Sequence, residues 1–198
     1  SLDLETALDA STIWAAALVG DGVDEVHLLH AGPVPGAVTY PDERALVEAV
    51  GARIRALDPD VLTGWNVVDF DLRTWERRCE ALGVASHWGR TPGAITFQQE
   101  LRFTRQSRAS VPGRIVVDAL PLVRDALRLE DYRLETVSRA LLGRGKRIDP
   151  EAPDAGAEIV RMYREDPEAL VAYNREDARL VMDILEKEGL LALALERS

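Results

Sequence analysis

The sequence predicts an α/β fold in which a mixed β-sheet, antiparallel at first and then joined by parallel strands, is flanked by helices. Two observations predict it. Apolar segments rich in β-formers open the chain, and after them stretches with apolar residues at helical spacing alternate with short strand-like segments. A length of 198 residues is enough for one such domain with a proper core. We therefore expect residues 1–198 to form a single domain.

The beginning of the chain predicts three antiparallel strands. Residues 1–6 indicate a first strand, and the apolar run Thr12–Val19 is typical of a buried second one. Glu25–His30 indicates a third, shorter strand. Between the last two, Gly20-Asp21-Gly22 is a hairpin turn signal.

Helical spacing then alternates with short strands. Apolar periodicity predicts a helix over Asp42–Leu57, which Pro59 ends before a strand at Val61–Trp65. A second helix is expected over Asp71–Ala81. The later expected elements are a strand at Ile115–Val117 and helices at Leu134–Leu142 and Glu168–Glu188, with a loop at Gly145–Gly156.

The stretch from Gly89 to Gly113 differs from its surroundings. Its prolines, glycines and alternating residues predict a hairpin or a long excursion. Arg102, Arg105 and Arg108 make it the one locally basic stretch of the chain, and aromatic residues are interleaved with them. Such a pattern suits single-stranded nucleic acid, although a solvated hairpin face explains it slightly better.

Bulk properties exclude several classes of protein. No apolar run reaches the length of about 18 residues that a membrane helix needs, and no secretory signal is visible. The single cysteine, Cys79, excludes an internal disulfide and fits a reducing cytoplasm. The three histidines are too scattered for a zinc site. A net charge of -10 argues against nucleic-acid binding through a generally basic surface, but not against a nuclease that holds metal ions on carboxylates.

Four acidic residues and one tyrosine in three separated segments are the most informative feature of the sequence. Asp3 and Glu5 are one residue apart, so a strand would place both on one face. Tyr173 and Asp177 are four apart and would project from one face of the last helix. Asp71 lies at a strand-to-helix transition, where its side chain can point over the sheet edge.

These acids are either a metal site or a scatter of surface carboxylates that never meet. Carboxylates brought together repel one another unless cations neutralise them. A site with only oxygen ligands suits Mg²⁺ or Mn²⁺ rather than zinc, and two such ions about 4 Å apart are a recurring arrangement for phosphodiester hydrolysis. Taken alone, Asp71 could instead be a helix N-cap, and Tyr173 a packed helix residue.

The three segments resemble the three exonuclease motifs of the proofreading domain of family B DNA polymerases. Asp3-Leu4-Glu5-Thr6 matches the pattern Asp-x-Glu-Thr, the segment from Asn66 to Asp71 matches Asn-x-x-x-Phe-Asp, and the segment from Tyr173 to Asp177 matches Tyr-x-x-x-Asp. The resemblance covers essentially the whole chain and is closest to the bacterial DNA polymerase II branch. The connecting segments that carry it are Gly64–Arg73, Gly113–Asp118, Leu134–Val137, Leu142–Lys146, Ala172–Asn174 and Leu195–Arg197.

The resemblance implies a ribonuclease H-like fold and a metal-dependent 3′→5′ exonuclease that proofreads unpaired DNA 3′ ends. It implies that Asp3, Glu5, Asp71 and Asp177 hold two Mg²⁺ (or Mn²⁺) ions, with Asp3 bridging both. Tyr173 would orient the attacking water, because a group with a pKa near 10 is a poor general base at neutral pH. The related class with a general-base histidine is disfavoured, since no histidine lies near Asp177.

Three further residues would contact the DNA strand according to the same resemblance: Thr6, Asn66 and Phe70. A turn residue and a core residue are the alternatives for Asn66 and Phe70. Asp69 also lies in the second motif, but the family pattern places the acid after the phenylalanine, which favours Asp71.

The resemblance further implies a fragment of a larger DNA polymerase, cytoplasmic and associated with the bacterial nucleoid. Its partners would be a single-stranded or frayed DNA 3′ end and the polymerase domains of the same chain, with no membrane. Two alternatives stay open. One is a free-standing exonuclease of the same fold acting on DNA or RNA, and the other is a catalytically silent nucleic-acid-binding domain.

Overall fold

The computed structural model describes residues 1–99, 107–145 and 155–196. The strands are β1 (Leu2–Thr6), β2 (Ile13–Gly20), β3 (Val23–Leu29), β4 (Val38–Tyr40), β5 (Val61–Gly64), β6 (Thr96–Gln99), β7 (Ser107–Ser110) and β8 (Ile115–Asp118). The helices are α1 (Glu43–Leu57), α2 (Arg73–Leu82), α3 (Ala119–Ala126), α4 (Leu134–Leu142), α5 (Ala155–Glu165), α6 (Pro167–Lys187) and α7 (Leu190–Glu196). A π-helical turn, η1 (Val68–Leu72), leads directly into α2.

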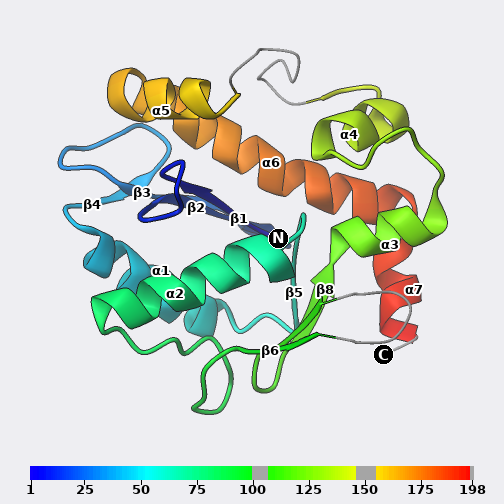
Figure 1. Ribbon diagram of the computed structural model, residues 1–198, viewed down its shortest axis with the longest axis horizontal. Helices are drawn as coiled ribbons and strands as arrows, with labels where there is room; N and C mark the ends of the chain where they lie inside the picture. The colour runs from blue at the N-terminus through cyan, green and yellow to red at the C-terminus, as the bar shows by residue number, and fades with distance from the viewer. Residues whose placement is uncertain (100–106, 146–154, 197–198) are drawn as a thin grey trace.

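A mixed sheet lies at the centre of the molecule (Figure 1). Its order is β1-β2-β3-β4, with antiparallel pairing among the first three strands and β4 parallel to β3. The strands β5 and β8 form a separate parallel pair. The end of β5 lies against β1, since a Cβ atom on Gly64 would come within 2.5 Å of the Leu2 carbonyl oxygen. The predicted fold class, antiparallel β1–β3 plus parallel strands and flanking helices, is confirmed.

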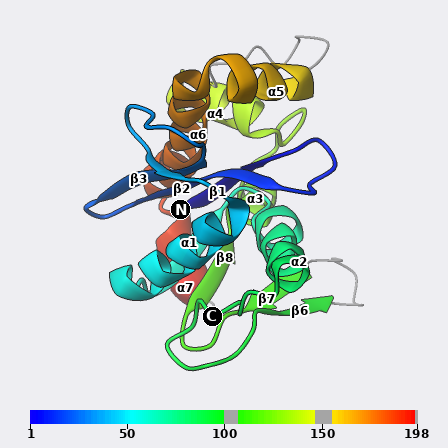
Figure 2. The same cartoon turned by 90° about the vertical axis from the view of Figure 1, so that its left-hand side faces the viewer.

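The two faces of the sheet carry different helices. Figure 2 shows α4, α5 and α6 on one side of it and α1 and α2 on the other. Alternation along β2 produces this division, because neighbouring residues of a strand point to opposite faces. Ala15 and Ala17 pack with residues of α6, whereas Ala16 and Leu18 belong to the core on the α1 side.

The helix predicted over Asp42–Leu57 is confirmed, with its first residue moved by one. Asp42 is the N-cap of α1, and its side chain accepts a hydrogen bond from the Ala45 amide at 2.8 Å. The helix predicted over Asp71–Ala81 begins differently. Asp71 lies inside η1, and Leu72 is the N-cap position of α2, so the N-cap interpretation of Asp71 is wrong.

The segment 89–113 contains a hairpin, as predicted, formed by the antiparallel strands β6 and β7. Arg108 lies exposed on β7, while Arg102 and Arg105 lie outside the described residues, as does most of the loop predicted at Gly145–Gly156. Strand β4 and helices α3, α5 and α7 were not predicted individually. Within the described ranges, no helix is long and apolar enough to span a bilayer.

Candidate active site

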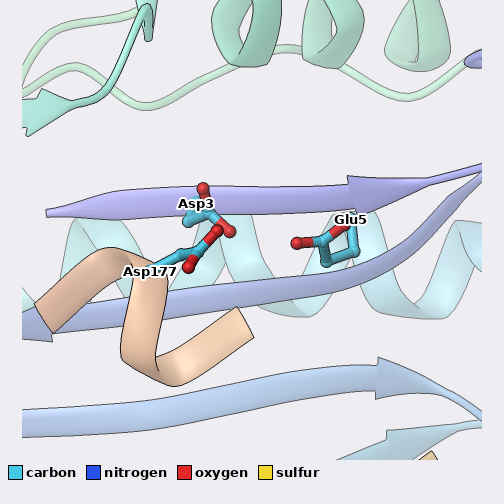
Figure 3. A group of neighbouring side chains, drawn as sticks. All are labelled: Asp3, Glu5 and Asp177. Atoms are coloured by element: carbon cyan, nitrogen blue, oxygen red, sulfur yellow. The ribbon is translucent and has the colours of Figure 1, made fainter. Parts of the chain in front are cut away.

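Three of the predicted metal-binding acids meet in the structure. Asp3 and Glu5 from β1 and Asp177 from α6 each offer a carboxylate oxygen, and these oxygens all lie within 4.8 Å of one another. Figure 3 shows Asp3 and Glu5 extending from the same strand, with the Asp177 carboxylate next to that of Asp3. The reading in which these three acids never meet is therefore excluded.

Small residues on β2 leave room for these three carboxylates to approach one another. In the β1–β2 ladder Asp3 lies opposite Ala17 and Glu5 lies opposite Ala15. Both alanines are completely buried under α6, and Ala178 of that helix is completely buried as well. Methyl groups at the contact allow the helix to lie close to the sheet, which brings Asp177 to the face that carries Asp3 and Glu5.

The helix α6 presents its functional side chains on one face. It follows the N-cap Asp166, which accepts a hydrogen bond from the Ala169 amide at 3.2 Å, and Pro167 occupies its first turn as predicted. Tyr173 and Asp177 lie one turn apart, and both are buried.

A cleft of about 520 Å³ opens beside these residues. Asp3, Tyr173 and Asp177 line one part of it. Asn66, which follows β5, also lines the cleft and has a left-handed backbone conformation with a φ of 57°. The remaining lining residues are Trp65, Leu120, Tyr132, Arg133, Leu134, Glu135 and Ala155.

Asp71 approaches the same strand from the side of η1. Its Oδ1 accepts a hydrogen bond of 2.8 Å from the amide of Leu4, the residue between Asp3 and Glu5. Burial raises the pKa of the Asp71 carboxyl well above its ordinary value of 3.8, and the nearby charge of Asp3 raises it further. The hydrogen bond from Leu4 acts in the opposite direction and does not outweigh these two effects. Asp71 is not one of the three acids that meet within 4.8 Å.

The neighbouring acid Asp69 has a different environment. Its side chain is half exposed, and it forms an ion pair with Arg73 at 3.2 Å on the surface of the helix. Of these two acids, only Asp71 is both buried and hydrogen-bonded to β1. This placement supports the choice of Asp71 over Asp69 as the acid of the second segment.

The other two predicted DNA contacts do not line the cleft. Thr6 follows an irregularity in the β1–β2 pairing, and its hydroxyl donates a hydrogen bond to the carbonyl oxygen of Ala7 at 2.9 Å. Phe70 is 40% exposed and lines a different hollow, together with Arg73 and Phe97. There the Arg73 guanidinium lies 4.6 Å from the centre of the Phe97 ring. Because Phe70 is this exposed, it is not a core residue.

Two residues near the acids were missed in the sequence. Asn174 donates hydrogen bonds from Nδ2 to the Asp3 carboxylate and to the Asp3 main-chain oxygen, and its place three residues before Asp177 on the same helix face could have indicated it. Asp118 caps α3, accepting from the Leu120 amide at 3.1 Å and from the Val68 amide at 3.1 Å. Burial raises the pKa of the Asp118 carboxyl, and its hydrogen bonds oppose that change.

Comparisons with known proteins agree with the geometry. The family model described as DNA polymerase family B, exonuclease domain, matches residues 21–137. DNA polymerase II of Escherichia coli (strain K12) is 32% identical over 207 residues, which cover 100% of this chain and 26% of that protein. The putative DNA polymerase 060R of Frog virus 3 (isolate Goorha) is 29% identical over 75% of this chain and 15% of its own length. The DNA polymerase of Thermococcus sp. (strain 9oN-7) is 29% identical over 72% of this chain and 18% of its own length.

The matches cover the candidate site in complementary ways. The span of the family model includes Asn66, Phe70 and Asp71, and the alignment with the Escherichia coli protein extends over the whole chain, including Asp3 and Asp177. The chain spans about a quarter of that relative, and a smaller share of the other two. The fold and the converging acids agree with these matches. The chain belongs to the exonuclease domain family of the family B DNA polymerases.

Proposed function

We propose that this chain hydrolyses phosphodiester bonds at unpaired DNA 3′ ends, one nucleotide at a time, in a proofreading reaction that uses two divalent metal ions. The observation that carries the proposal is the convergence of Asp3, Glu5 and Asp177 within 4.8 Å beside a cleft. Membership of the family B exonuclease domains supports the direction of the reaction, 3′→5′.

The donor set fits Mg²⁺ or Mn²⁺. Asp3, Glu5, Asp71 and Asp177 offer only carboxylate oxygens, the ligands that these ions prefer. Burying several carboxylates together costs free energy, as the raised pKa of Asp71 indicates, and bound cations would offset that cost. Asp3 would be shared between the two ions, as the family resemblance implies, and it lies close to Asp177. Ions held there would lower the pKa of a bound water and stabilise charge on the leaving oxygen.

The remaining side chains have positioning roles in this proposal. The Tyr173 hydroxyl orients the attacking water rather than removing a proton, because a phenol with an unperturbed pKa near 10 is a poor general base at neutral pH. Asn66 contacts the strand inside the cleft, and Thr6 and Phe70 contact it beyond the cleft. A preference for frayed or mismatched ends follows, because a paired terminus must first be melted at a cost in free energy.

Digestion of a 5′-labelled single-stranded DNA oligonucleotide tests the proposal. With Mg²⁺ or Mn²⁺ we expect a ladder that shortens from the 3′ end, and EDTA or Asp3→Ala should abolish it. The pair Asp71→Ala and Asp69→Ala is a matched comparison within one segment: the first should abolish cleavage and the second should leave it within a few-fold of wild type. Equal losses in both variants would remove Asp71 from the metal site.

The same assay separates the alternatives. An RNA oligonucleotide of the same sequence measures the preference for DNA. A folded chain that binds DNA but cleaves neither substrate with either metal would be a silent binding domain instead. We further propose that the chain is a single domain of a larger polymerase, because it corresponds to 26% of the Escherichia coli protein. Polymerase activity in the product of the complete gene tests that proposal.

A further inference from the structure

We infer that Asn174 is a positioning residue for the nuclease reaction, and that its amide fixes the orientation in which the Asp3 carboxylate receives metal ions. The inference rests on the proposed function. Asn174 lies on α6 between Tyr173 and Asp177 and is completely buried. Its Nδ2 atom lies 2.7 Å from Oδ2 of Asp3 and 3.0 Å from the Asp3 main-chain oxygen.

The orientation of this amide is determined by its surroundings. The main-chain carbonyl oxygen of Asp3 can only accept hydrogen bonds, so the NH₂ end of Asn174 must face Asp3. The Oδ1 atom at the other end is buried and has no hydrogen-bond partner among the described residues. An asparagine that contributed only to packing would have no reason to bury an unpaired oxygen, because an apolar side chain of the same size would avoid that cost.

The two hydrogen bonds from Asn174 restrict the orientation of the Asp3 carboxylate and the distance between Asp3 and α6. The bond to Oδ2 limits rotation of the Asp3 carboxylate, which would otherwise have several rotamers on the strand face. It uses one acceptor position of Oδ2, and a carboxylate has about four such positions on its two oxygens. The bond to the main-chain oxygen ties α6 to β1 at the point where Asp177 approaches Asp3.

A neutral amide is well suited to this role. A lysine or arginine in its place would neutralise Asp3 and compete with divalent ions for its charge. An acid in its place would repel Asp3. Groups that hold metal ligands by hydrogen bonds commonly change metal affinity or activity about 10–100-fold when they are substituted.

The test uses Asn174→Leu, which keeps the approximate shape of the side chain and removes the donor. We expect the Mg²⁺ concentration for half-maximal cleavage to rise about 10–100-fold, with much of the rate recovered at saturating Mg²⁺. Isothermal titration calorimetry of the DNA-free chain with Mn²⁺ should show the same loss of affinity for the metal. In EDTA the Tm should fall, because the two hydrogen bonds that tie α6 to Asp3 are lost, while removal of the unpaired Oδ1 offsets part of that cost.

Thr63→Val is the matched control, since Thr63 on β5 is also buried and its hydroxyl has no partner in the described part of the chain. It should leave the Mg²⁺ dependence unchanged. If Asn174→Leu does not fold, Asn174→Ala removes the same donor with a smaller side chain. A wild-type Mg²⁺ dependence in a folded variant, with or without a lower Tm, would leave Asn174 a structural residue only. A wild-type chain that neither binds Mn²⁺ nor cleaves DNA would overturn the proposed function as well.

Discussion

Asp69 and Asp71 are two residues apart and lie in opposite environments. Asp69 is at the surface beside Arg73, and Asp71 is buried beneath β1 with its Oδ1 on the Leu4 amide. The raised pKa of Asp71 means that its ionised form is destabilised in the folded chain when no cation is bound. At the scale of single residues, burial of Asp71 is therefore a stability cost, which the proposed metal ions would offset.

The substitution Asp71→Asn should raise the Tm of the metal-free chain at pH 7 and abolish cleavage. Because the pKa of Asp71 is higher in the folded than in the unfolded chain, stability falls as the pH rises from about 3.8 through the folded value. The variant does not lose stability in this way, because asparagine does not ionise. An increase of a few degrees is expected, since about 1 kcal/mol corresponds to about 2–4 °C for a chain of this size.

Thermal unfolding in EDTA at several pH values measures this difference. The control is Asp69→Asn, which should change the stability by no more than about 0.5 kcal/mol because the side chain is exposed. A lower Tm for Asp71→Asn than for wild type at pH 7 would show that the hydrogen bond from Leu4 outweighs the cost of burial.

Tyr173→Phe should separate water positioning from metal binding. The variant keeps the ring that packs under β2 and loses only the hydroxyl. We expect the cleavage rate to fall by about 10²-fold, the cost of misplacing a reacting group, while Mn²⁺ affinity stays within about twofold of wild type. Single-turnover cleavage beside Tyr163→Phe on α5 provides the comparison. Equal rates for the two variants would remove Tyr173 from the reaction.

At the scale of elements, the site depends on how closely α6 lies against the sheet. The strand β2 and the helix α6 meet there through small side chains, Ala15 and Ala17 on β2 and Ala178 on α6, all completely buried. The acids themselves contribute little attraction, because they repel one another without cations. Apolar packing in this cluster, with the hydrogen bonds from Asn174 to Asp3, therefore holds Asp177 near Asp3, and the alanines set how closely the helix approaches.

Ala17→Leu tests this role of packing. The larger side chain has no space between β2 and α6, so we expect a loss of about 1–3 kcal/mol in the free energy of unfolding. The helix should also move away from Asp3, and the Mg²⁺ concentration for half-maximal cleavage should rise. Ala52→Leu on the exposed face of α1 is the control and should affect neither quantity. A destabilised variant with unchanged Mg²⁺ dependence would show that the spacing of the acids does not depend on Ala17.

At the scale of the whole molecule, charge and metal binding are linked. The chain carries a net charge of -10, and several of its carboxylates are gathered at one cleft. A ligand that binds only the folded state stabilises it by mass action. If the proposed site binds divalent ions, these ions should therefore act on this chain as stabilising ligands.

We expect Mn²⁺ or Mg²⁺ to raise the Tm of the wild-type chain. At a concentration about 100 times the dissociation constant the gain is about 2.7 kcal/mol. Asp3→Ala should remove most of this gain, whereas Asp21→Ala in the exposed turn between β2 and β3 should retain it. Differential scanning fluorimetry at constant ionic strength makes the measurement. An equal Tm increase in wild type and Asp3→Ala would indicate general screening of negative charge.

Spacing along the chain is enough to predict which of the candidate site residues share one face of their strand or helix. A strand alternates its side chains and a helix repeats every 3.6 residues, so Asp3 with Glu5, and Tyr173 with Asp177, could be paired by spacing alone. The fold class followed from the same periodicities. Short elements such as β4 and α7 were not predicted, because a segment of so few residues shows too little periodicity to be distinguished from a loop.

How the three segments meet depends on tertiary packing. The approach of α6 to β1 depends on the packing of alanines that are distant in sequence, and the contact between Asn174 and Asp3 spans 171 positions. The position of Asp71 depends on the π-helical turn η1, which places its carboxylate within hydrogen-bonding distance of the Leu4 amide. Spacing within one element fixes directions locally, whereas distances between elements are set by packing, which no single segment of the sequence contains.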